Sequence, residues 1–422
     1  MNKKKLILTS GMANTFEWYD YALFGQFAPI IGAKFFPDND PKVAVLQAFL
    51  VFAIGYLVRP VGGIFFGIIG DKFGRKVALS SAVMCMAIPT ATIGFLPTYE
   101  TWGFTSTVLM IVVRMLQGLS MGGALTGSVS FIIEHTTKEK RGFFGSIPMS
   151  CICVGILLGS LVSFTIKSVF SEEIFDLWAW RIPFIFGIVV FFAGIYIKNN
   201  TNETPVFEAS KDQGKLVKNP LRTSFKEHWV GMVISIFINS TGSILFYMEA
   251  VYLISYLKIT RHFPEIAVNY LVNVCYVIMI FATLFAGWLS DKIGRRKIYV
   301  INIIFTMVTI PFLLNFFEKE SFFMVAVAQI IISIISSFYI GPEPALQAEL
   351  YPSKVRNTAL SISYNTATSI FGGTAPYIME SLVQNTGTIT TSVYYIIFAS
   401  CSSLLALYFY KDRSLEDVYV NS

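Results

Sequence analysis

A short basic motif occurs twice in this chain, each time between two long apolar runs. The first copy, Gly-Asp-Lys-Phe-Gly-Arg-Lys, covers 70–76, and the second, Ser-Asp-Lys-Ile-Gly-Arg-Arg-Lys, covers 290–297. The aspartates of the two copies, Asp71 and Asp291, are 220 positions apart, about half of the 422 residues. Self-similarity at such a long offset indicates a chain built from two related halves.

A second pair of charges repeats with nearly the same offset. Glu134 is followed seven residues later by Arg141, and Glu349 is followed seven residues later by Arg356, so this pair recurs after 215 positions. Two charged motifs that recur at almost one offset favour a duplication over two unrelated basic loops.

The composition indicates a membrane protein. Hydrophobic residues make up 54% of the chain and charged residues 14%, and the mean hydropathy is +0.62, far from an ordinary soluble domain. Apolar runs of about 20 residues, the length that a bilayer requires, recur along the chain. The twelve predicted spans are 9–35, 43–69, 77–96, 104–133, 143–167, 180–197, 229–257, 266–289, 298–316, 322–348, 358–383 and 391–410.

The positive charges predict the orientation. Most of the 32 Lys and Arg residues lie at the two chain ends and in every second loop, and cytoplasmic loops are enriched in these residues. Both termini and both repeated loops are therefore predicted to be cytoplasmic. The net charge of +6 follows from this asymmetry and requires no nucleic-acid partner. The 5 cysteines lie within predicted spans and the 3 histidines lack ligand spacing, so we predict no metal site.

One long polar break divides the chain. Residues 199–228 are rich in Lys, Asn, Glu and Thr and fall between the sixth and seventh spans. We therefore predict an N-terminal six-helix half over 1–198, a cytoplasmic linker over 199–228, a C-terminal six-helix half over 229–410 and a short cytoplasmic tail over 411–422.

Two acidic residues interrupt the first span. Glu17 and Asp20 are three positions apart and share one face of a helix. An ionisable side chain inside a bilayer costs about 2.5 to 3.5 kcal/mol on lenient scales, which points to function. Such a pair can bind and release a proton; the alternative is a structural pair satisfied by neighbouring helices. Arg114 of the fourth span reaches a similar depth, with Gln117 one turn further, and either clamps a substrate carboxylate or neutralises the acids.

Other polar groups in the spans are weaker candidates. Arg59 precedes a proline in the second span and either lines the pore or reaches the headgroups. The Gly-Pro-Glu-Pro segment around Glu343 breaks the tenth span, which predicts a place at an inner cavity. Glu249 of the seventh span is a candidate for the outer cavity. Rings such as Tyr19 and Tyr247 could cage a quaternary ammonium group, although most rings in a membrane chain pack in the core.

The repeated loops have a chemistry of their own. Gly74 permits a tight turn, Asp71 offers an acceptor to an arginine or a helix N-terminus, and Arg75 and Lys76 anchor to the inner surface. Glu134 and the arginine after it place complementary charges on another loop. We predict a cytoplasmic latch worth only a few kcal/mol, since an over-stable closed state would not open. The predicted gate residues are Asp71, Gly74, Arg75, Lys76, Glu134, Arg141, Asp291, Gly294, Arg295, Arg296, Glu349 and Arg356.

These motifs resemble those of the major facilitator superfamily and, within it, the metabolite:proton symporters. The loop at 70–76 resembles the signature between helices two and three, and 290–297 its second-half copy. Arg114-x-x-Gln117-Gly118 resembles the helix-four motif held to act in proton coupling. Motifs similar to the narrower subfamily are Glu17-Trp18-Tyr19-Asp20, Phe35-Phe36-Pro37, Trp180-Arg181-Ile182-Pro183-Phe184, Glu203-Thr204-Pro205, and Gly372-Gly373 with Pro376. The match runs from about Gly11 to Tyr410 and is nearest to the proline/betaine transporters.

The resemblance implies an all-helical twelve-span carrier, not an enzyme, that imports a small zwitterionic or carboxylated solute with a proton by alternating access. A dicarboxylate or 2-oxoglutarate symporter, a drug/proton antiporter and a non-transporting solute sensor are the alternatives. Similar proteins carry an acidic residue where this chain has Ala124, so proton coupling would depend on Glu17, Asp20 and Glu343. The expected partners are the solute and the lipid bilayer. We expect a monomer in a bacterial inner membrane, with no cofactor beyond the coupling proton.

Overall fold

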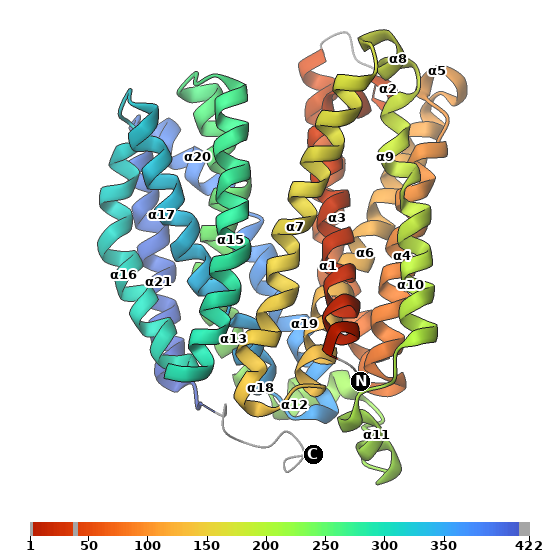
Figure 1. Ribbon diagram of the computed structural model, residues 1–422, viewed down its shortest axis with the longest axis vertical. Helices are drawn as coiled ribbons and strands as arrows, with labels where there is room; N and C mark the ends of the chain where they lie inside the picture. The colour runs from red at the N-terminus through yellow and green to blue at the C-terminus, as the bar shows by residue number, and fades with distance from the viewer. Residues whose placement is uncertain (1–2, 37–40, 413–422) are drawn as a thin grey trace.

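The computed structural model describes residues 3–36 and 41–412. Pro37 of the Phe-Phe-Pro motif and most of the predicted tail over 411–422 lie outside these ranges. The described residues form helices and contain no β-strand. Figure 1 shows two bundles side by side, one coloured red to yellow-green and the other green to blue.

The first bundle contains the helices that precede the polar break. Long helices alternate in direction and short ones cover the end opposite the repeated loops (Figure 1). Their bounds are α1 (Lys3–Gln26), α2 (Ala28–Phe35), α3 (Pro41–Phe73), α4 (Arg75–Phe95), α5 (Tyr99–Trp102), α6 (Phe104–Glu134), α7 (Arg141–Val169), α8 (Glu172–Leu177), α9 (Ile182–Ile185) and α10 (Gly187–Asn200).

Two short helices occupy the polar break, and the second bundle follows. The linker helices are α11 (Pro205–Asp212) and α12 (Pro220–Glu227). The second bundle consists of α13 (Trp229–Tyr247), α14 (Leu253–Ser255), α15 (Glu265–Ile293), α16 (Arg295–Phe316), α17 (Phe322–Ile340), α18 (Glu343–Glu349), α19 (Arg356–Ala367), α20 (Ala375–Thr386) and α21 (Ser392–Phe409). Turns of π-helix at Met248–Tyr252 and Tyr256–Thr260 extend α13, and one at Thr368–Gly372 joins α19 to α20.

Among the described residues, 10 helical segments are long and apolar enough to cross a membrane. The first and eleventh predicted spans are not among them, for a physical reason visible in their sequences. The first holds Glu17 and Asp20, and the helix α19 that begins the eleventh starts at Arg356 and carries several Ser, Thr and Asn residues. Both nevertheless lie inside their bundles as helices, so that their polar side chains are covered by protein, the arrangement that a bilayer tolerates.

The helices end where the backbone requires it. Gly74 and Gly294, in the repeated loops, have φ angles of 112° and 96°, which glycine adopts without steric cost. They separate α3 from α4 and α15 from α16. The Gly-Pro-Glu-Pro segment divides α17 from α18, since α17 ends at Ile340 and α18 begins at Glu343.

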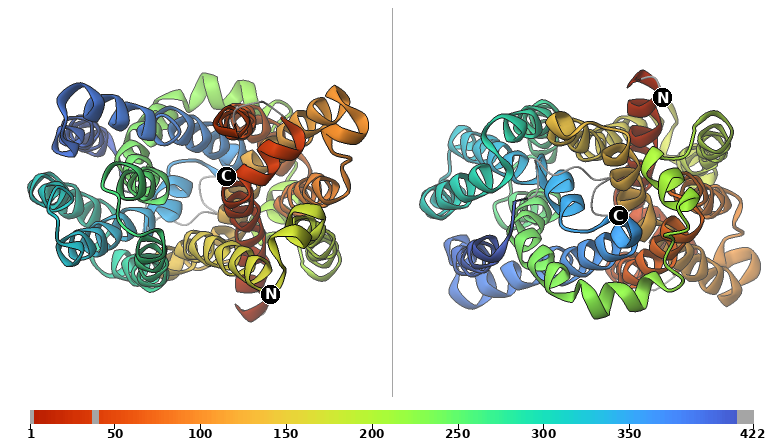
Figure 2. Two further views of the ribbon diagram at one scale, coloured as in Figure 1. Left: turned by 90° about the horizontal axis from the view of Figure 1, so that it is seen from above. Right: turned by 90° about the horizontal axis from the view of Figure 1, so that it is seen from below.

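The bundles meet along two helix pairs, α7 with α15 and α3 with α19. In both end-on views of Figure 2 the halves occupy opposite sides and touch along the middle. Small residues permit this approach: a Cβ on Gly287 would lie 2.5 Å from the carbonyl oxygen of Gly142. We call the end of the bundles that carries the repeated loops the basic end, which the charge distribution predicts to face the cytoplasm.

Candidate functional site

Asp20 lies at the centre of a buried polar network in the first bundle. Gln117 Nε2 donates to both of its carboxylate oxygens at 2.9 Å, and Thr90 Oγ1 donates to one at 3.0 Å. Arg114 Nη1 lies 3.2 Å from Asp20 Oδ2, and its guanidinium lies 3.8 Å from the Phe24 ring centroid. Helix α1 thus brings the acid, α4 the hydroxyl, and α6 both the arginine and the amide to one place, as the predicted depths of Asp20 and Arg114 suggested.

Glu17, one turn before Asp20, pairs with a different arginine. Glu17 Oε1 lies 3.6 Å from Arg59 Nη2, and both side chains are buried. Neither Glu17 oxygen accepts a hydrogen bond from the described residues. Arg59 lies over the Tyr56 ring, 5.1 Å from its centroid, and therefore takes the interior position of the two that its sequence allowed. The two acids of the first span consequently have separate partners.

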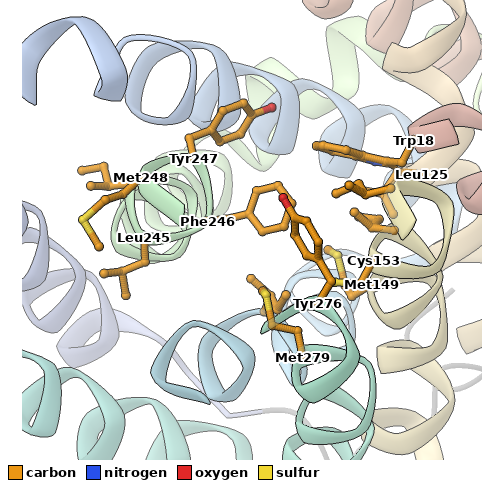
Figure 3. Packing of buried hydrophobic residues seen from close by; sticks show 14 of the residues in the cluster. Trp18, Leu125, Met149, Cys153, Leu245, Phe246, Tyr247, Met248, Tyr276 and Met279 are labelled. Atoms are coloured by element: carbon orange, nitrogen blue, oxygen red, sulfur yellow. The ribbon is translucent and has the colours of Figure 1, made fainter. Parts of the chain in front are cut away.

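A small cavity lies between the bundles. Rings from both halves line it: Trp18 from α1, Phe246 and Tyr247 from α13, and Tyr364 from α19. Figure 3 shows Phe246 projecting toward Trp18, and the two rings meet edge to face at 5.3 Å. The Tyr247 hydroxyl donates to that of Tyr56 at 2.9 Å. The cavity volume of about 20 Å³ holds on the order of one water molecule, so the cavity has no room for a solute in this structure.

Glu343 supplies the carboxylate among the residues that line this cavity. It lies at the first position of α18, directly after the helix break, and accepts a hydrogen bond from Gln347 Nε2 at 2.7 Å. Glu343 also lines a second cavity of about 10 Å³. A carboxylate beside several aromatic faces is suited to a cationic group.

Two predicted residues lie away from these cavities. Glu249 sits in the π-helical turn Met248–Tyr252, where Ser333 Oγ donates to its carboxylate. Tyr19 donates to the Pro183 carbonyl at 3.2 Å and its ring packs 5.8 Å from that of Phe186. Tyr19 therefore packs within the first bundle and does not join the ring of aromatic residues between the halves.

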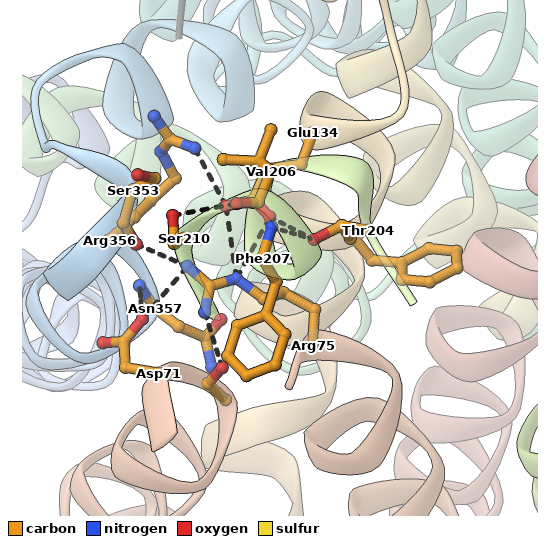
Figure 4. Close-up of polar contacts among 12 residues, drawn as sticks. Asp71, Arg75, Glu134, Thr204, Val206, Phe207, Ser210, Ser353, Arg356 and Asn357 are labelled. Atoms are coloured by element: carbon orange, nitrogen blue, oxygen red, sulfur yellow. Dashed lines mark hydrogen bonds and ion pairs between the residues drawn. The ribbon is translucent and has the colours of Figure 1, made fainter. Parts of the chain in front are cut away.

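At the basic end, Glu134 binds arginines from both halves. Arg75 Nε lies 3.2 and 3.1 Å from its two oxygens, and Arg356 Nη1 donates at 2.9 Å. Figure 4 shows the Glu134 carboxylate between the two guanidinium groups. Arg75 also donates to the carbonyl oxygens of Gly70, at 2.6 Å, and Ser353. Because Arg356 and Ser353 belong to the second half, these contacts join the two bundles.

The aspartates of the repeated loops cap helices of the opposite half. Asp71 accepts backbone N–H bonds from Asn357 and Thr358, at 3.2 and 2.8 Å, in the first turn of α19. Asp291 accepts from Gly142 and from Phe143, at 2.8 and 2.9 Å, in the first turn of α7. Helix N-termini carry partial positive charge, so each carboxylate stabilises the contact between the halves.

The second copy of the gate repeats the first, with longer distances at its glutamate. Glu349 Oε1 lies 3.4 Å from Arg295 of its own half and 3.9 Å from Arg141 of the other. Arg295 also lies 2.8 Å from Asp291. Glu134 and Arg141, which the sequence presents as complementary charges, therefore bind partners across the interface instead of each other. The neighbouring gate candidate Arg296 is exposed.

The linker contributes contacts that sequence reasoning did not assign. The Glu203 carboxylate accepts from the backbone N–H groups of Arg75, at 2.9 Å, and Lys76, at 3.2 Å, and so caps α4. Burial raises the pKa of the Glu203 carboxyl, and these donors oppose that effect. Thr204 donates to Glu134 at 2.6 Å, and the Phe207 ring lies under Arg75. A Thr followed by Pro at a helix start is a capping signal that could have marked this segment.

Fold and site together define a membrane transport protein with two helical bundles and a small cavity between them. Residues 6–228 match the family model described as sugar (and other) transporter, and residues 232–420 match the model of the major facilitator superfamily. The chain belongs to the major facilitator superfamily, whose twelve-helix fold agrees with the predicted spans. It is a transporter and not an enzyme.

Curated relatives and solved structures agree with this assignment. The chain is 30% identical to the glycine betaine/proline/ectoine/pipecolic acid transporter OusA of Dickeya dadantii, over 97% of this chain and 84% of the relative. It is 30% identical to the proline/betaine transporter of Salmonella typhimurium, over 95% of this chain and 82% of the relative. The proton:xylose symporter XylE, bound to 6-bromo-6-deoxy-D-glucose, shares the fold with a TM-score of 0.77 and 19% identity, covering 96% of this chain and 94% of XylE.

Proposed function

We propose that this protein is a proton-coupled symporter that imports a small zwitterionic solute of the proline or glycine betaine type by alternating access. Two relatives that match nearly the whole chain are named for such solutes, which supports the substrate class. The proposed setting is a bacterial inner membrane, with the basic end and both termini in the cytoplasm. The working unit is a monomer, and the proton is the coupling ion.

The observation that carries the proposal is the pairing of aromatic rings with a carboxylate around the central cavity, with an arginine behind one of the rings. Glu343 faces the cavity from the second half. Arg59 of the first half lies over the ring of Tyr56, and the Tyr56 hydroxyl accepts a hydrogen bond from Tyr247, a residue of the cavity lining. A zwitterion can place its cationic group against Glu343 and the rings and its carboxylate toward Arg59. Each end of the solute then contacts a different half.

Proton coupling is proposed for Asp20 and Glu17. Asp20 has Arg114 and two neutral donors as partners, and Glu17 has Arg59 alone at 3.6 Å. Loss of the negative charge by protonation releases either arginine from its ion pair. Arg59 then becomes available to a solute carboxylate, so that solute and proton share one coupling free energy.

Alternating access is proposed to use the contacts at the basic end. Capped helices and shared glutamates hold the halves together on that side, and opening requires that they separate. Because the contacts are distributed over two pseudo-symmetric sets, each can contribute a small part of the few kcal/mol that a reversible gate allows.

Reconstitution tests the proposal directly. Purified protein in proteoliposomes is given an imposed inward proton gradient and labelled proline, glycine betaine or 2-oxoglutarate in parallel. We expect gradient-driven accumulation of one or both zwitterions. Accumulation of 2-oxoglutarate alone would assign the chain to dicarboxylate transport, and uptake indifferent to the gradient would refute symport.

A matched pair of variants tests the site. Glu343→Gln removes the cavity carboxylate, and Glu320→Gln makes the same change at an exposed position of the same half. We expect Glu343→Gln to raise the KM for the zwitterion at least about tenfold, as loss of about 1.4 kcal/mol predicts, and Glu320→Gln to leave it unchanged. Equal KM values would remove Glu343 from the solute site.

A further inference from the structure

Glu249 is a buried carboxylate that lines neither of the two cavities and makes none of the gate contacts described above. It is 2% exposed and lies in the π-helical turn Met248–Tyr252 of the second half. One carboxylate oxygen accepts a hydrogen bond from Ser333 of α17, and the other has no hydrogen-bond partner among the described residues. Turns of π-helix are rare and occur frequently at functional sites.

The surroundings of Glu249 contain no compensating charge. No Lys, Arg or His of the described residues lies within ion-pair distance, 4.0 Å, of its carboxylate. Helix α17 presents Ser333, α14 carries no titratable side chain, and Glu380 of α20 interacts with Tyr252 and not with Glu249. The titratable groups close enough to interact electrostatically with it are Cys153 of α7 and Cys275 and Tyr276 of α15.

Neighbouring side chains cover Glu249. Glu249 is 2% exposed and lines neither of the two cavities between the bundles. An ionised carboxylate with one hydrogen bond and no cation is disfavoured at membrane depth, whereas the neutral acid is tolerated. The ligand that satisfies both conditions is a proton.

The same segment offers support for the charged form after a rearrangement. Gln329, one turn from Ser333 on α17, is fully buried, and both polar atoms of its side chain lack a partner among the described residues. Its amide is an unused donor on the face of α17 that already binds Glu249 through Ser333. Helices α7 and α15, whose Cys153, Cys275 and Tyr276 interact electrostatically with Glu249, also form one of the two pairs along which the halves meet.

We propose that Glu249 is a proton-binding site of the second half, separate from the acids of the first half, that is loaded while the halves are joined at the basic end and emptied when α7 and α15 separate. The proton leaves the carboxylic acid for an entering water molecule, which yields a carboxylate and a hydronium ion; reloading reverses the step. This inference rests on the proposed symport cycle for its consequence, which is one additional proton per solute. Proton binding itself is independent of transport.

Infrared difference spectroscopy tests proton binding on the purified protein. At neutral pH the spectrum of wild type minus Glu249→Gln should contain the C=O stretch of a protonated carboxylic acid, which wild type minus Glu320→Gln should lack. In the background of Arg356→Ala, which we expect to loosen the gate, that band should weaken as the pH is raised. Ser333→Ala keeps the acid but removes its hydrogen bond, and should move the band to higher wavenumber. A missing band in the first spectrum, or a band in the gate variant that no pH change weakens, would overturn the inference.

Proton stoichiometry tests the consequence in proteoliposomes. Under a gradient of about one pH unit, the loss of one coupled proton should lower the limiting solute accumulation about tenfold in Glu249→Gln, with solute exchange and the Glu320→Gln control unchanged. If the wild type accumulates solute to the same level with and without the gradient, the proposed symport is refuted. The infrared result then decides alone whether Glu249 binds a proton. Gradient-driven accumulation that is equal in wild type and Glu249→Gln would refute the second coupled proton alone.

Discussion

Glu134 of the first half accepts a hydrogen bond from Arg356 of the second half at 2.9 Å. The equivalent contact in the other copy, between Glu349 and Arg141, is 3.9 Å long. All four side chains are buried, so the attraction is weakly screened and depends steeply on geometry. The two copies of the gate therefore have the same arrangement of contacts but unequal strength. The loss of the Glu134 contact is the change that should open the basic end.

Replacing Arg356 by Ala should shift the population toward a state open at the basic end. Removal of one partner from a buried pair typically costs about 3 to 5 kcal/mol, part of which Arg75 recovers by remaining on Glu134. A cysteine introduced at Val129, which lines the smaller cavity, reports the opening in a background without native cysteines. We expect its alkylation by an impermeant maleimide from the basic side to become at least about tenfold faster.

The matched control is Arg296→Ala, because Arg296 lies in a repeated loop of the same end and is exposed. Its alkylation rate should equal that of the parent protein. An Arg356→Ala rate no faster than this control would mean that the ion pair does not hold the gate.

Replacing Asp20 by Asn should separate coupling from solute movement. Asn can keep hydrogen bonds with Thr90 and Gln117 but cannot exchange a proton at physiological pH. We expect gradient-driven accumulation to fall at least about tenfold, within the usual range of coupling factors, while counterflow exchange of solute changes less than about twofold. The measurement compares both modes in the same vesicles, with Asp176→Asn, an exposed acid of the same half, as control. Equal loss of both modes would make Asp20 structural.

The span pattern and the repeated loops were predictable because a bilayer imposes length and apolarity on every helix, and because a duplicated loop keeps its glycine and its charges. The pairing across the halves was not predictable in the same way. Glu134 and Arg141 are close in sequence, yet Glu134 contacts an arginine and Arg141 contacts a glutamate that lie more than 200 positions away. Only the packing of α3 on α19 and of α7 on α15 brings these partners together.

The candidate site was predictable for residues whose position along a helix decides the contact. Asp20, Arg114 and Gln117 share one depth in the first bundle, and they meet. Tyr19 was misplaced because a ring on the first span can point into its own bundle or toward the other half, and a sequence gives no sign of which. The linker residue Glu203 was not assigned, because a polar segment is expected to be exposed to solvent. Only the structure shows that the first residue of α4 lies against it.

Replacing Gly287 by Ala should weaken the packing of α15 on α7. The new Cβ would lie 2.5 Å from the carbonyl oxygen of Gly142 and 2.5 Å from Ser146 Oγ, so the helices must move apart. Overpacking of this kind costs about 1 to 3 kcal/mol and should lower Tm and raise the alkylation of the Val129→Cys reporter. Gly25→Ala is the control, because Gly25 is exposed and a Cβ there meets nothing within 4 Å. A Tm equal to that of the control would show that α7 accommodates the methyl group.

Replacing His135 by Phe should remove a part of the stability that the protein loses in acid. His135 follows α6 at the basic end, and its ring lies 4.5 Å from that of Phe131. Burial lowers the pKa of His135 below its ordinary 6.5, more than the hydrogen bond with the Phe131 carbonyl raises it. Below about pH 6.5 the unfolded chain takes up a proton that the folded protein resists, so this contribution to stability is present at higher pH and is lost as the pH falls through the lowered pKa. Phe keeps the ring contact without the titration. The Tm of His135→Phe minus that of wild type should therefore rise as the pH falls from about 7.5 to 5, and a difference that stays constant would exclude His135 as a source of acid sensitivity.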